Sequence, residues 1–338
     1  MRSPGLVLIL IAGFVGVVTN AFIDGTAFMA VEVDEVVAPA DAAQGHGIVR
    51  VDHPLLPGRF GGLEDELLAS PMLWHPEFQD EVERWVRFWE TAPKQWFPSY
   101  LDRMTWFEGM VDARLAEHGL PWSLRYLPVI ESGYSPSAVS SASAVGLWQF
   151  MAPTARDFGI EVTRYVDDRR DPFESTAAAT QFLDDLHKEF GSWFLALAAY
   201  NAGPHRIRQI LRRYAPNTEM TDALYWSVRK FLPKETREYM PNLIAAIIVA
   251  SDPVAHGYAA PESRPFVFDR VPVVGRITFD AVALAAGTSR EEIERLNPEY
   301  VEGVTPDKRE VDLRVPVGQG RSFREYFAEG PGRDRPGR

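Results

Sequence analysis

The chain has 338 residues, of which 46% are hydrophobic and 24% charged, so it holds enough apolar material for a buried core and is not disordered along its whole length. That length predicts more than one domain. The net charge of −12 makes nucleic acid an unexpected partner. The sequence contains no cysteine, which excludes disulfides, thiolate metal sites, cysteine nucleophiles and a lipidated N-terminal cysteine.

Residues 1–30 have the layout of a secretory signal. Arg2 precedes an apolar run from Gly5 to Val18, and small residues follow. We therefore expect an exported protein of the periplasm or cell envelope. The alternative is a retained signal-anchor that tethers the N-terminus to the membrane, because the stretch from Gly5 to Ile23 is marginally long enough to cross a bilayer.

Residues 31–66 are acidic and then rich in Pro, Gly and Ala, which indicates a flexible linker. A helical period begins at Phe78 and continues to Val111, so residues 67–117 are predicted to form a helical extension. Its aromatic side chains are interpreted mainly as core, with a sugar-binding groove as the alternative, because aromatic faces suit pyranose rings. These residues are Trp85, Phe88, Trp89, Trp96, Phe97 and Trp106.

Residues 118–255 indicate a mainly α domain, because no clear strand pattern interrupts a succession of helical segments. We expect helices near 121–131, 176–190, 192–201 and 243–250. Pro128 lies inside the first of these and must either kink that helix or shift its start.

The composition changes after a Pro-containing linker at about 253–265. Two extended segments, 266–274 and 313–317, flank two short helices, so residues 264–318 are predicted to form a small α+β module. The short helices are expected at 279–286 and 290–296. Residues 319–338 are charged and contain Gly and Pro, which predicts a disordered tail.

Glu131 is the first candidate for chemistry. Metal and nucleotide motifs such as HExxH, Walker A and GxGxxG do not occur in the sequence, so we expect no cofactor. Glu131 ends a predicted helix and has apolar residues nearby, and both features would raise its pKa. A carboxyl group that stays protonated near neutral pH suits a general acid for a glycosidic oxygen. The alternative is a solvated glutamate that closes a helix.

An ordered set of motifs follows Glu131. It comprises Glu131-Ser132, Gly146-Leu-Trp-Gln-Phe-Met151, Tyr165 to Thr176 (YVDDRRDPFEST), Ala199-Tyr-Asn-Ala-Gly203 and Pro233 to Tyr239 (PKETREY). This set resembles the lysozyme-like lytic transglycosylases, in particular the membrane-bound D type. The resemblance implies a mainly α chain with a goose-type lysozyme-like catalytic domain over residues 118–255.

The resemblance also implies roles for individual residues. It assigns the single acid/base role to Glu131. The implied groove residues are Ser140, Gln149, Tyr200, Asn201, Glu235 and Tyr239. Three of them have a structural alternative: Gln149 as a cap at a helix start, Tyr200 as a core tyrosine, and Glu235 as part of a surface ion pair.

The implied reaction acts on peptidoglycan glycan strands. Glu131 would protonate the oxygen between N-acetylmuramic acid and N-acetylglucosamine, and the C6 hydroxyl of the sugar would then attack, giving a 1,6-anhydromuramoyl end. One rival is a hydrolytic muramidase of the goose-type lysozyme kind, which needs a second carboxylate to direct water. Its candidates are Asp157, Asp167, Asp168 and Asp171. Another rival is a wall-binding protein without catalysis.

The C-terminal module resembles a degenerate LysM glycan-binding module. The resemblance rests on Ala286-Gly-Thr288, Leu296-Asn-Pro298 and Leu313-Arg-Val-Pro316, whereas the usual Tyr-Thr opening is replaced by Gly275-Arg-Ile-Thr278. Two functions therefore stay open for this module: it binds glycan, or it only packs against the catalytic domain.

Overall fold

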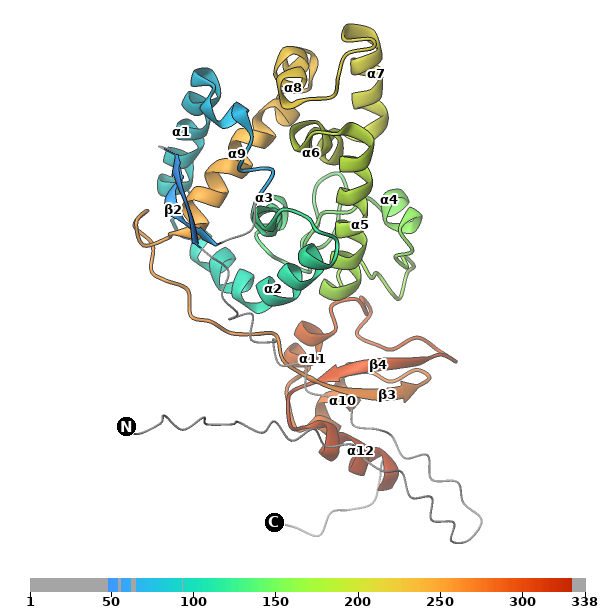
Figure 1. Cartoon of the computed structure of the whole chain (residues 1–338). Helices are drawn as coiled ribbons and strands as arrows, with labels where there is room; N and C mark the ends of the chain where they lie inside the picture. Colours follow the sequence, from blue (N-terminus) through green and yellow to red (C-terminus); the bar gives the residue numbers. More distant parts are fainter. Residues whose placement is uncertain (1–47, 54–55, 62–64, 93, 330–338) are drawn as a thin grey trace, which may run out of the picture. The chain divides into compact units, whose positions relative to one another are not determined.

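The computed structural model describes residues 48–53, 56–61, 65–92 and 94–329 (Figure 1). This described part contains twelve α-helices and four short strands, so the predicted mainly α class is confirmed. The signal sequence predicted over residues 1–30 lies outside it. No helix among the described residues combines the length and the apolar character needed to cross a bilayer.

A β-hairpin lies within the segment predicted as a linker. Strands β1 (Ile48–His53) and β2 (Leu56–Gly61) pair antiparallel. The sequence did not predict β2 because it contains proline and glycine, which are depleted in strands. Asp65 also belongs to the helical fold, since its carboxylate accepts hydrogen bonds from the backbone N–H groups of Leu68 at 3.0 Å and Ser123 at 2.9 Å. The expected linker is therefore corrected at these positions, while the other domain boundaries stay predictions.

The helical extension consists of α1 (Pro76–Thr91) and α2 (Phe97–Glu117), preceded by the 3-10 turn η1 (Pro71–Trp74). Each helix has a proline in its first turn, where the missing N–H needs no partner. Helix α1 buries one apolar face against α9 (Lys234–Ser251).

Two elements replace the single helix predicted for 121–131. A 3-10 turn, η2 (Trp122–Tyr126), leads into the short helix α3 (Leu127–Ser132). Pro128 falls in the first turn of α3, so this proline shifts the start of the helix rather than kinking it. Gly133 ends α3 with a left-handed φ of 59°, and Glu131 therefore lies in the last turn.

The remaining helices of this part surround a buried centre. They are α4 (Ala152–Asp157), α5 (Pro172–Phe190), α6 (Trp193–Ala202), α7 (Pro204–Tyr214) and α8 (Asp222–Val228), with the 3-10 turn η3 (Arg229–Phe231) before α9. Helix α6 lies between α5 and α9 and is buried from Trp193 to Ala199 (Figure 1). Helix α5 starts four residues before the predicted helix, because the Asp171 carboxylate caps its first turn.

The C-terminal module has its own core. Strands β3 (Asp269–Val274) and β4 (Glu310–Val315) pair antiparallel, with Val271 opposite Leu313, and the helices α10 (Phe279–Ala286) and α11 (Arg290–Leu296) lie between them in sequence. Residues Val271, Phe279, Ile293 and Leu313 are fully or almost fully buried there. This agrees with the predicted α+β module.

Helix α12 (Gly320–Glu329) corrects the prediction of a disordered tail after residue 318. Phe323 is 3% exposed and belongs to the core of the module, with Tyr326 and Phe327 packed against it. The charged composition of this stretch concealed its helical spacing of aromatic residues. Residues 330–338 lie outside the described part.

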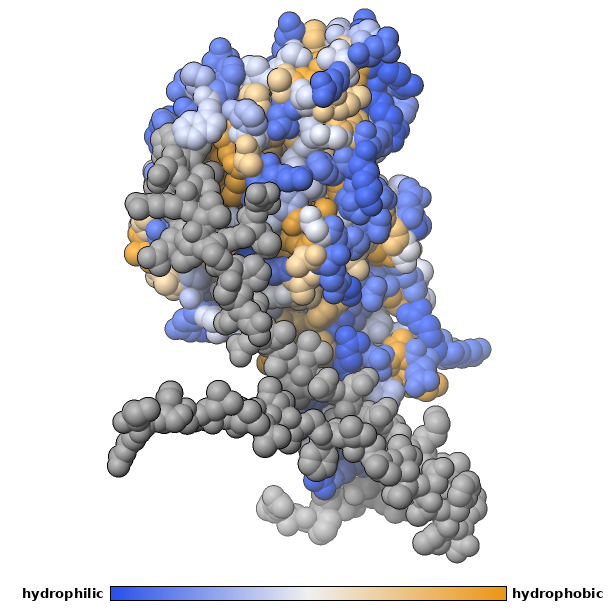
Figure 2. Space-filling view, viewed as in Figure 1, coloured by the Kyte–Doolittle hydropathy of each residue, from blue (hydrophilic) through white to orange (hydrophobic). Residues whose placement is uncertain are grey.

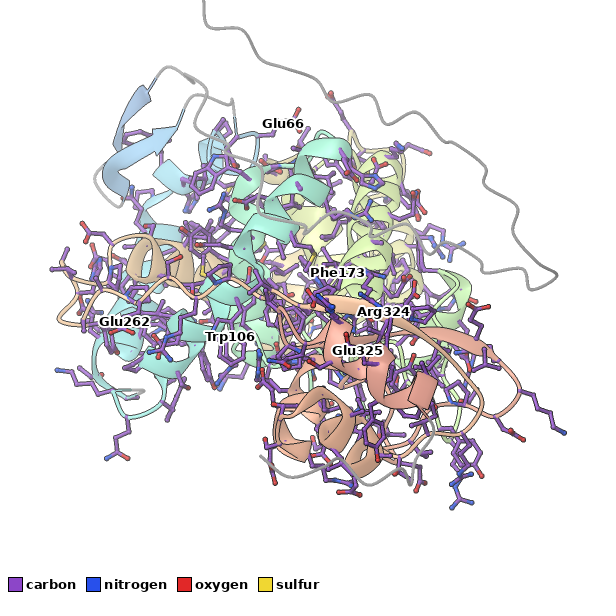
Figure 3. The ribbon with its side chains drawn as sticks, turned by 90° about the horizontal axis from the view of Figure 1, so that it is seen from below. Glu66, Trp106, Phe173, Glu262, Arg324 and Glu325 are labelled. Carbon is purple, nitrogen blue, oxygen red and sulfur yellow. The ribbon has the colours of Figure 1, made fainter. Side chains whose placement is uncertain are left out.

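The C-terminal module contacts the preceding helices through both apolar and charged side chains. Phe266 donates its N–H to the carbonyl of Trp106 at 3.0 Å, and Phe173 on α5 packs edge to face on Phe268. Trp106 and Phe173 are labelled in Figure 3. Beside them, the guanidinium of Arg314 in β4 is buried between two carboxylates. It pairs with Asp171 and, at 3.1 Å, with Glu299. The surface of the helical part is mostly hydrophilic on the face shown in Figure 2, with apolar residues exposed between polar ones.

Candidate active site

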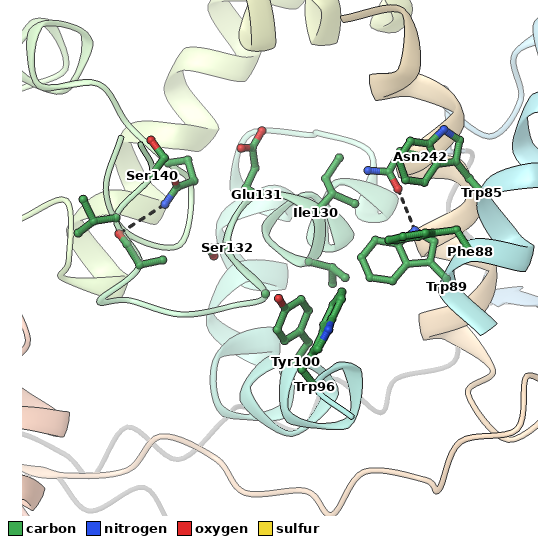
Figure 4. Close-up of a pocket in the computed structure, with 15 residues that line it drawn as sticks. Trp85, Phe88, Trp89, Trp96, Tyr100, Ile130, Glu131, Ser132, Ser140 and Asn242 are labelled. Atoms are coloured by element: carbon green, nitrogen blue, oxygen red, sulfur yellow. Dashed lines mark hydrogen bonds between the residues drawn. The ribbon is translucent and has the colours of Figure 1, made fainter. Parts of the chain in front are cut away.

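A pocket of about 440 Å³ lies between the helical extension and the loops that follow α3 (Figure 4). Glu131 points into it from the last turn of α3. One side, here called the aromatic wall, consists of Trp85, Phe88, Trp89, Trp96 and Tyr100 from the helical extension and the turn between its helices. The other side, here called the loop wall, consists of Ala138, Val139, Ser140 and Gln149. Glu131 is the only charged residue among the described residues that line the pocket.

The Glu131 carboxyl is held in its protonated form more strongly than an ordinary glutamate. Burial raises its pKa to about 7, the hydrogen bond from the Tyr239 hydroxyl lowers it, and the negative charge of Glu235 raises it. The neutral and charged forms are therefore both well populated near pH 7. This is the condition that a group needs if it first donates a proton and then accepts one.

Helix α9 supplies both residues that act on the Glu131 carboxyl. Glu235 and Tyr239 are four residues apart, so they lie on the same face of the helix. Tyr239 is 7% exposed, and burial together with the Glu131 charge raises its pKa well above its ordinary value of 10. Its hydroxyl is thus a permanent donor to the carboxyl at neutral pH.

The Gly146–Met151 motif forms a loop that is pinned beside Glu131. The Ser132 hydroxyl donates to the Leu147 carbonyl at 2.8 Å, and the Tyr200 hydroxyl donates to the Trp148 carbonyl at 2.7 Å. The indole N–H of Trp148 donates to the Thr176 hydroxyl at 2.9 Å. Residues from α3, α5 and α6 therefore all hold this one loop.

Gly146 allows the loop to pack directly on the neighbouring segment. Its φ is +87°, and a Cβ atom at this position would lie 1.8 Å from the carbonyl oxygen of Arg169. Arg169 itself is buried, and its Nη1 donates to the carbonyls of Phe150 at 3.1 Å and Ser143 at 3.2 Å. Asp167 pairs with Arg169 at 2.8 Å and also donates its N–H to the carbonyl of Glu299 in the C-terminal module.

Ser140 and Gln149 are the two predicted groove residues that line the pocket beside Glu131. The Ser140 hydroxyl accepts hydrogen bonds from the N–H groups of Ala142 and Ala144, so it also shapes its own turn. Gln149 has a left-handed φ of 53°, and its side-chain nitrogen donates to the Gly146 carbonyl at 3.0 Å. The alternative of a cap at a helix start is wrong for Gln149, because α4 begins only at residue 152.

The other predicted groove residues, Tyr200, Asn201, Glu235 and Tyr239, do not line the pocket. The Tyr200 hydroxyl donates its hydrogen bond inside the protein, as the alternative of a core tyrosine requires. Burial and the charge of Glu131 raise the pKa of Tyr200 well above 10. Asn201 accepts a hydrogen bond from the Thr236 hydroxyl at 2.8 Å and does not line the pocket. Glu235 is exposed, and its role as a groove residue or as part of a surface ion pair stays a prediction. Whether these residues touch a ligand stays a prediction.

Sequence reasoning gave the aromatic part of the pocket only as an alternative. It interpreted the aromatic residues of the extension mainly as core, and Trp89 and Phe97 are indeed buried. Phe88 and Trp96, however, are 38% and 39% exposed and line the pocket. The helical periodicity of these aromatic residues does not distinguish a ring that is buried in the core from a ring that lines the pocket. Asn242, which accepts a hydrogen bond from the Trp89 indole at 2.8 Å, had no signal in the sequence.

None of the four aspartates considered as a second carboxylate lines the pocket. Asp157 is exposed at the end of α4, while Asp167 and Asp171 pair with Arg169 and Arg314. Asp168 lies near the C-terminal module, where burial and then the charges of neighbouring carboxylates raise its pKa to about 7. The described residues also contain no group of three His, Asp or Glu side chains that could hold a metal ion.

Two family models match the chain in the regions that the fold separates. Residues 111–220 match the transglycosylase SLT domain, and residues 267–330 match the LysM-like domain of lytic transglycosylase MltD, a match that includes α12. The region that contains Glu131 is therefore similar to the transglycosylase SLT domain, in agreement with the resemblance that its motifs carry.

The chain is similar to named proteins as well. It is 33% identical over 233 residues to membrane-bound lytic murein transglycosylase D of Escherichia coli strain K12. This alignment covers 64% of this chain and 49% of that protein. It is 35% identical over 117 residues to a putative tributyltin chloride resistance protein of Alteromonas sp. strain M-1, which covers 32% of this chain and 56% of that protein. The chain thus spans about half the length of these curated relatives. The structure of lytic transglycosylase Slt from Pseudomonas aeruginosa aligns with 47% of this chain and 26% of its own, at 26% identity and a TM-score of 0.35.

Proposed function

We propose that this protein is a peptidoglycan lytic transglycosylase that cleaves the β-1,4 bond between N-acetylmuramic acid and N-acetylglucosamine. The observation that carries the proposal is a carboxyl group with a pKa of about 7 in a pocket whose other described lining residues are uncharged. The similarity to lytic murein transglycosylases, which covers the same region, supports it.

The reaction needs only one carboxyl group. Protonated Glu131 donates its proton to the glycosidic oxygen, and the N-acetyl oxygen of the substrate stabilises the cationic centre. The Glu131 carboxylate then takes the proton of the C6 hydroxyl, whose oxygen attacks the same sugar and closes a 1,6-anhydro ring. Because this hydroxyl is tethered to the reacting carbon, it has a high effective concentration and competes well against water.

The surrounding residues support this reaction in distinct ways. Tyr239 donates to the Glu131 carboxyl and orients it, and Glu235 helps to keep its pKa high. Gln149 uses its side-chain nitrogen within its own loop, so its side-chain oxygen is the atom available to an N-acetyl N–H. Ser140 faces the same space from the loop wall. Tyr200 and Asn201 act as positioning residues for the loop and for α9.

The products released from purified peptidoglycan test the proposal. Mass spectrometry should find muropeptides that end in an anhydro sugar, lighter by one water than lysozyme products. Glu131→Gln keeps the size and shape of the side chain but cannot donate the proton, and it should slow release by about a hundred- to ten-thousand-fold. Reducing muramic acid ends would instead support the goose-type hydrolase, and Asp157, Asp167, Asp168 and Asp171 would be the first residues to substitute. No release by the folded wild type would support a wall-binding protein without catalysis.

Two further parts of the proposal concern place and cofactor. The protein works in the periplasm or envelope, with its N-terminal segment as a cleaved signal or a tether, which fractionation of cells that produce the full chain tests. It needs no metal or nucleotide. Loss of activity with a chelator, restored by one specific divalent ion, would contradict this.

A further inference from the structure

The aromatic wall is continuous with the pocket that holds Glu131, yet no step of the proposed reaction uses it. Its members come from the helical extension, whereas Glu131 and the loop wall come from the following domain (Figure 4). An exposed aromatic cluster beside a reactive carboxyl is a candidate for binding rather than for packing.

The rings of the aromatic wall form an unbroken series. Phe88 packs edge to face on Trp89 at 5.6 Å between ring centroids, Trp89 packs on Trp96 at 6.1 Å, and Trp96 packs on Tyr100 at 4.9 Å. Trp89 is 4% exposed, while Phe88 and Trp96 are 38% and 39% exposed. The buried ring therefore supports two neighbours that remain accessible from the pocket.

This series is held rigidly against the rest of the protein. The indole N–H groups of Trp85 and Trp89 donate to Glu238 and Asn242 of α9, each at 2.8 Å. Tyr100 packs so closely on the backbone after Glu131 that a Cβ atom at Gly133 would lie 2.4 Å from its ring. A wall fixed in this way loses little conformational entropy when a ligand binds.

The chemistry of the two walls matches a sugar. A pyranose ring has an apolar face of C–H groups, which carry slight positive charge, and a rim of hydroxyl and N-acetyl groups. Aromatic faces carry the negative part of the ring quadrupole and attract such C–H groups. The opposite wall offers the hydroxyl of Ser140 and the amide of Gln149. The lining of the described pocket carries no cation that would favour an acidic peptide.

We propose that Phe88 and Trp96 of the helical extension form a stacking subsite for an N-acetylated sugar of the glycan strand, outside the pair of sugars joined by the cleaved bond. This inference rests on the proposed function, because it extends the same groove. It gives the extension a role in binding long glycan strands, in addition to covering α9.

The test measures binding separately from cleavage. The full chain with Glu131→Gln is titrated with the hexamer of N-acetylglucosamine, which carries no peptide, by isothermal titration calorimetry. Adding Phe88→Ala or Trp96→Ala should weaken binding by about tenfold or more, whereas Trp96→Tyr keeps a ring and should stay within about threefold. The matched control is Phe231→Ala, since Phe231 is also 39% exposed but does not line the pocket. It should leave the affinity unchanged.

The outcomes separate this inference from the proposed function. If wild type releases fragments from peptidoglycan but both alanine variants, folded by circular dichroism, bind the hexamer as the Phe231→Ala control does, only the stacking subsite is wrong. The same holds if Trp96→Tyr loses as much affinity as Trp96→Ala. If wild type releases no fragments while the alanine variants still lose hexamer affinity, the subsite stands and the proposed reaction fails. Absence of any hexamer binding overturns the subsite.

Discussion

Glu131→Gln should stabilise the folded protein at neutral and alkaline pH, in addition to slowing its reaction. The reason is the pKa of the Glu131 carboxyl, which rises from 4.5 in an exposed glutamate to about 7 in the fold, chiefly through burial. Below about pH 4.5 the carboxyl is protonated in both the folded and the unfolded chain, and its ionisation contributes nothing. Between about pH 4.5 and about pH 7 the Glu131 carboxyl ionises only in the unfolded chain, so the wild type loses stability as the pH rises. Above about pH 7 the loss is complete and constant.

The magnitude follows from the two pKa values. Two and a half pH units at about 1.4 kcal/mol each give a ceiling of about 3.5 kcal/mol. Because the carboxyl opens into a pocket that water can enter, we expect about 1 to 3 kcal/mol after screening. A glutamine does not ionise, so the free energy of unfolding of the variant, relative to wild type, should increase by this amount between about pH 4.5 and about pH 8.

Glu238→Gln is the matched control with the opposite sign. Burial alone would raise the pKa of Glu238, but hydrogen bonds from Arg84 and Trp85 outweigh it and lower the pKa. Its charge therefore stabilises the fold above the ordinary pKa and loses this effect as the pH falls through the lowered value, so the substitution should cost about 0.2 to 1 kcal/mol near neutral pH. Urea unfolding followed by tryptophan fluorescence measures both variants. A relative stability of Glu131→Gln that stays flat with pH would refute a carboxyl of raised pKa, and with it the basis for the general acid.

Three further predictions concern the support of the site. Tyr239→Phe removes the hydrogen bond that lowers the pKa of Glu131, so the alkaline limb of the pH–rate profile should move to higher pH; a limb at or below that of wild type would contradict this. Arg314→Met leaves two buried carboxylates without their cation and should lower the free energy of unfolding by about 3 to 5 kcal/mol, against about 0 to 1 for Arg309→Met at an exposed pair. Equal losses in urea unfolding would refute that role. Gly146→Ala should destabilise the protein by about 3 kcal/mol or more and abolish glycan release, whereas Gly159→Ala, also at positive φ but with nothing within 4 Å, should cost about 1 kcal/mol; similar melting temperatures would contradict the close contact.

The sequence alone determined the elements whose signals are local. The apolar centre of α9, the glycine after Phe190 and the helices at 279–286 and 290–296 could be predicted because period and caps act within a few residues. Glu131 could be singled out from its place at a helix end and from the ordered motifs around it. Local signals failed where short-range chemistry was ambiguous, as in β2 with its proline and in α12 with its charged residues.

The tertiary structure decided which side chains meet. The pKa of Glu131 depends on burial and on Tyr239 and Glu235, more than a hundred residues away in sequence. An exposed Phe88 and a buried Trp89 are neighbours in one helix, and only the position of α9 decides which of the two rings is covered. Likewise, the carboxylates that bury Arg314 lie in two different parts of the chain. Burial and electrostatic coupling depend on distance in space, and sequence spacing specifies that distance only within a helix or a strand.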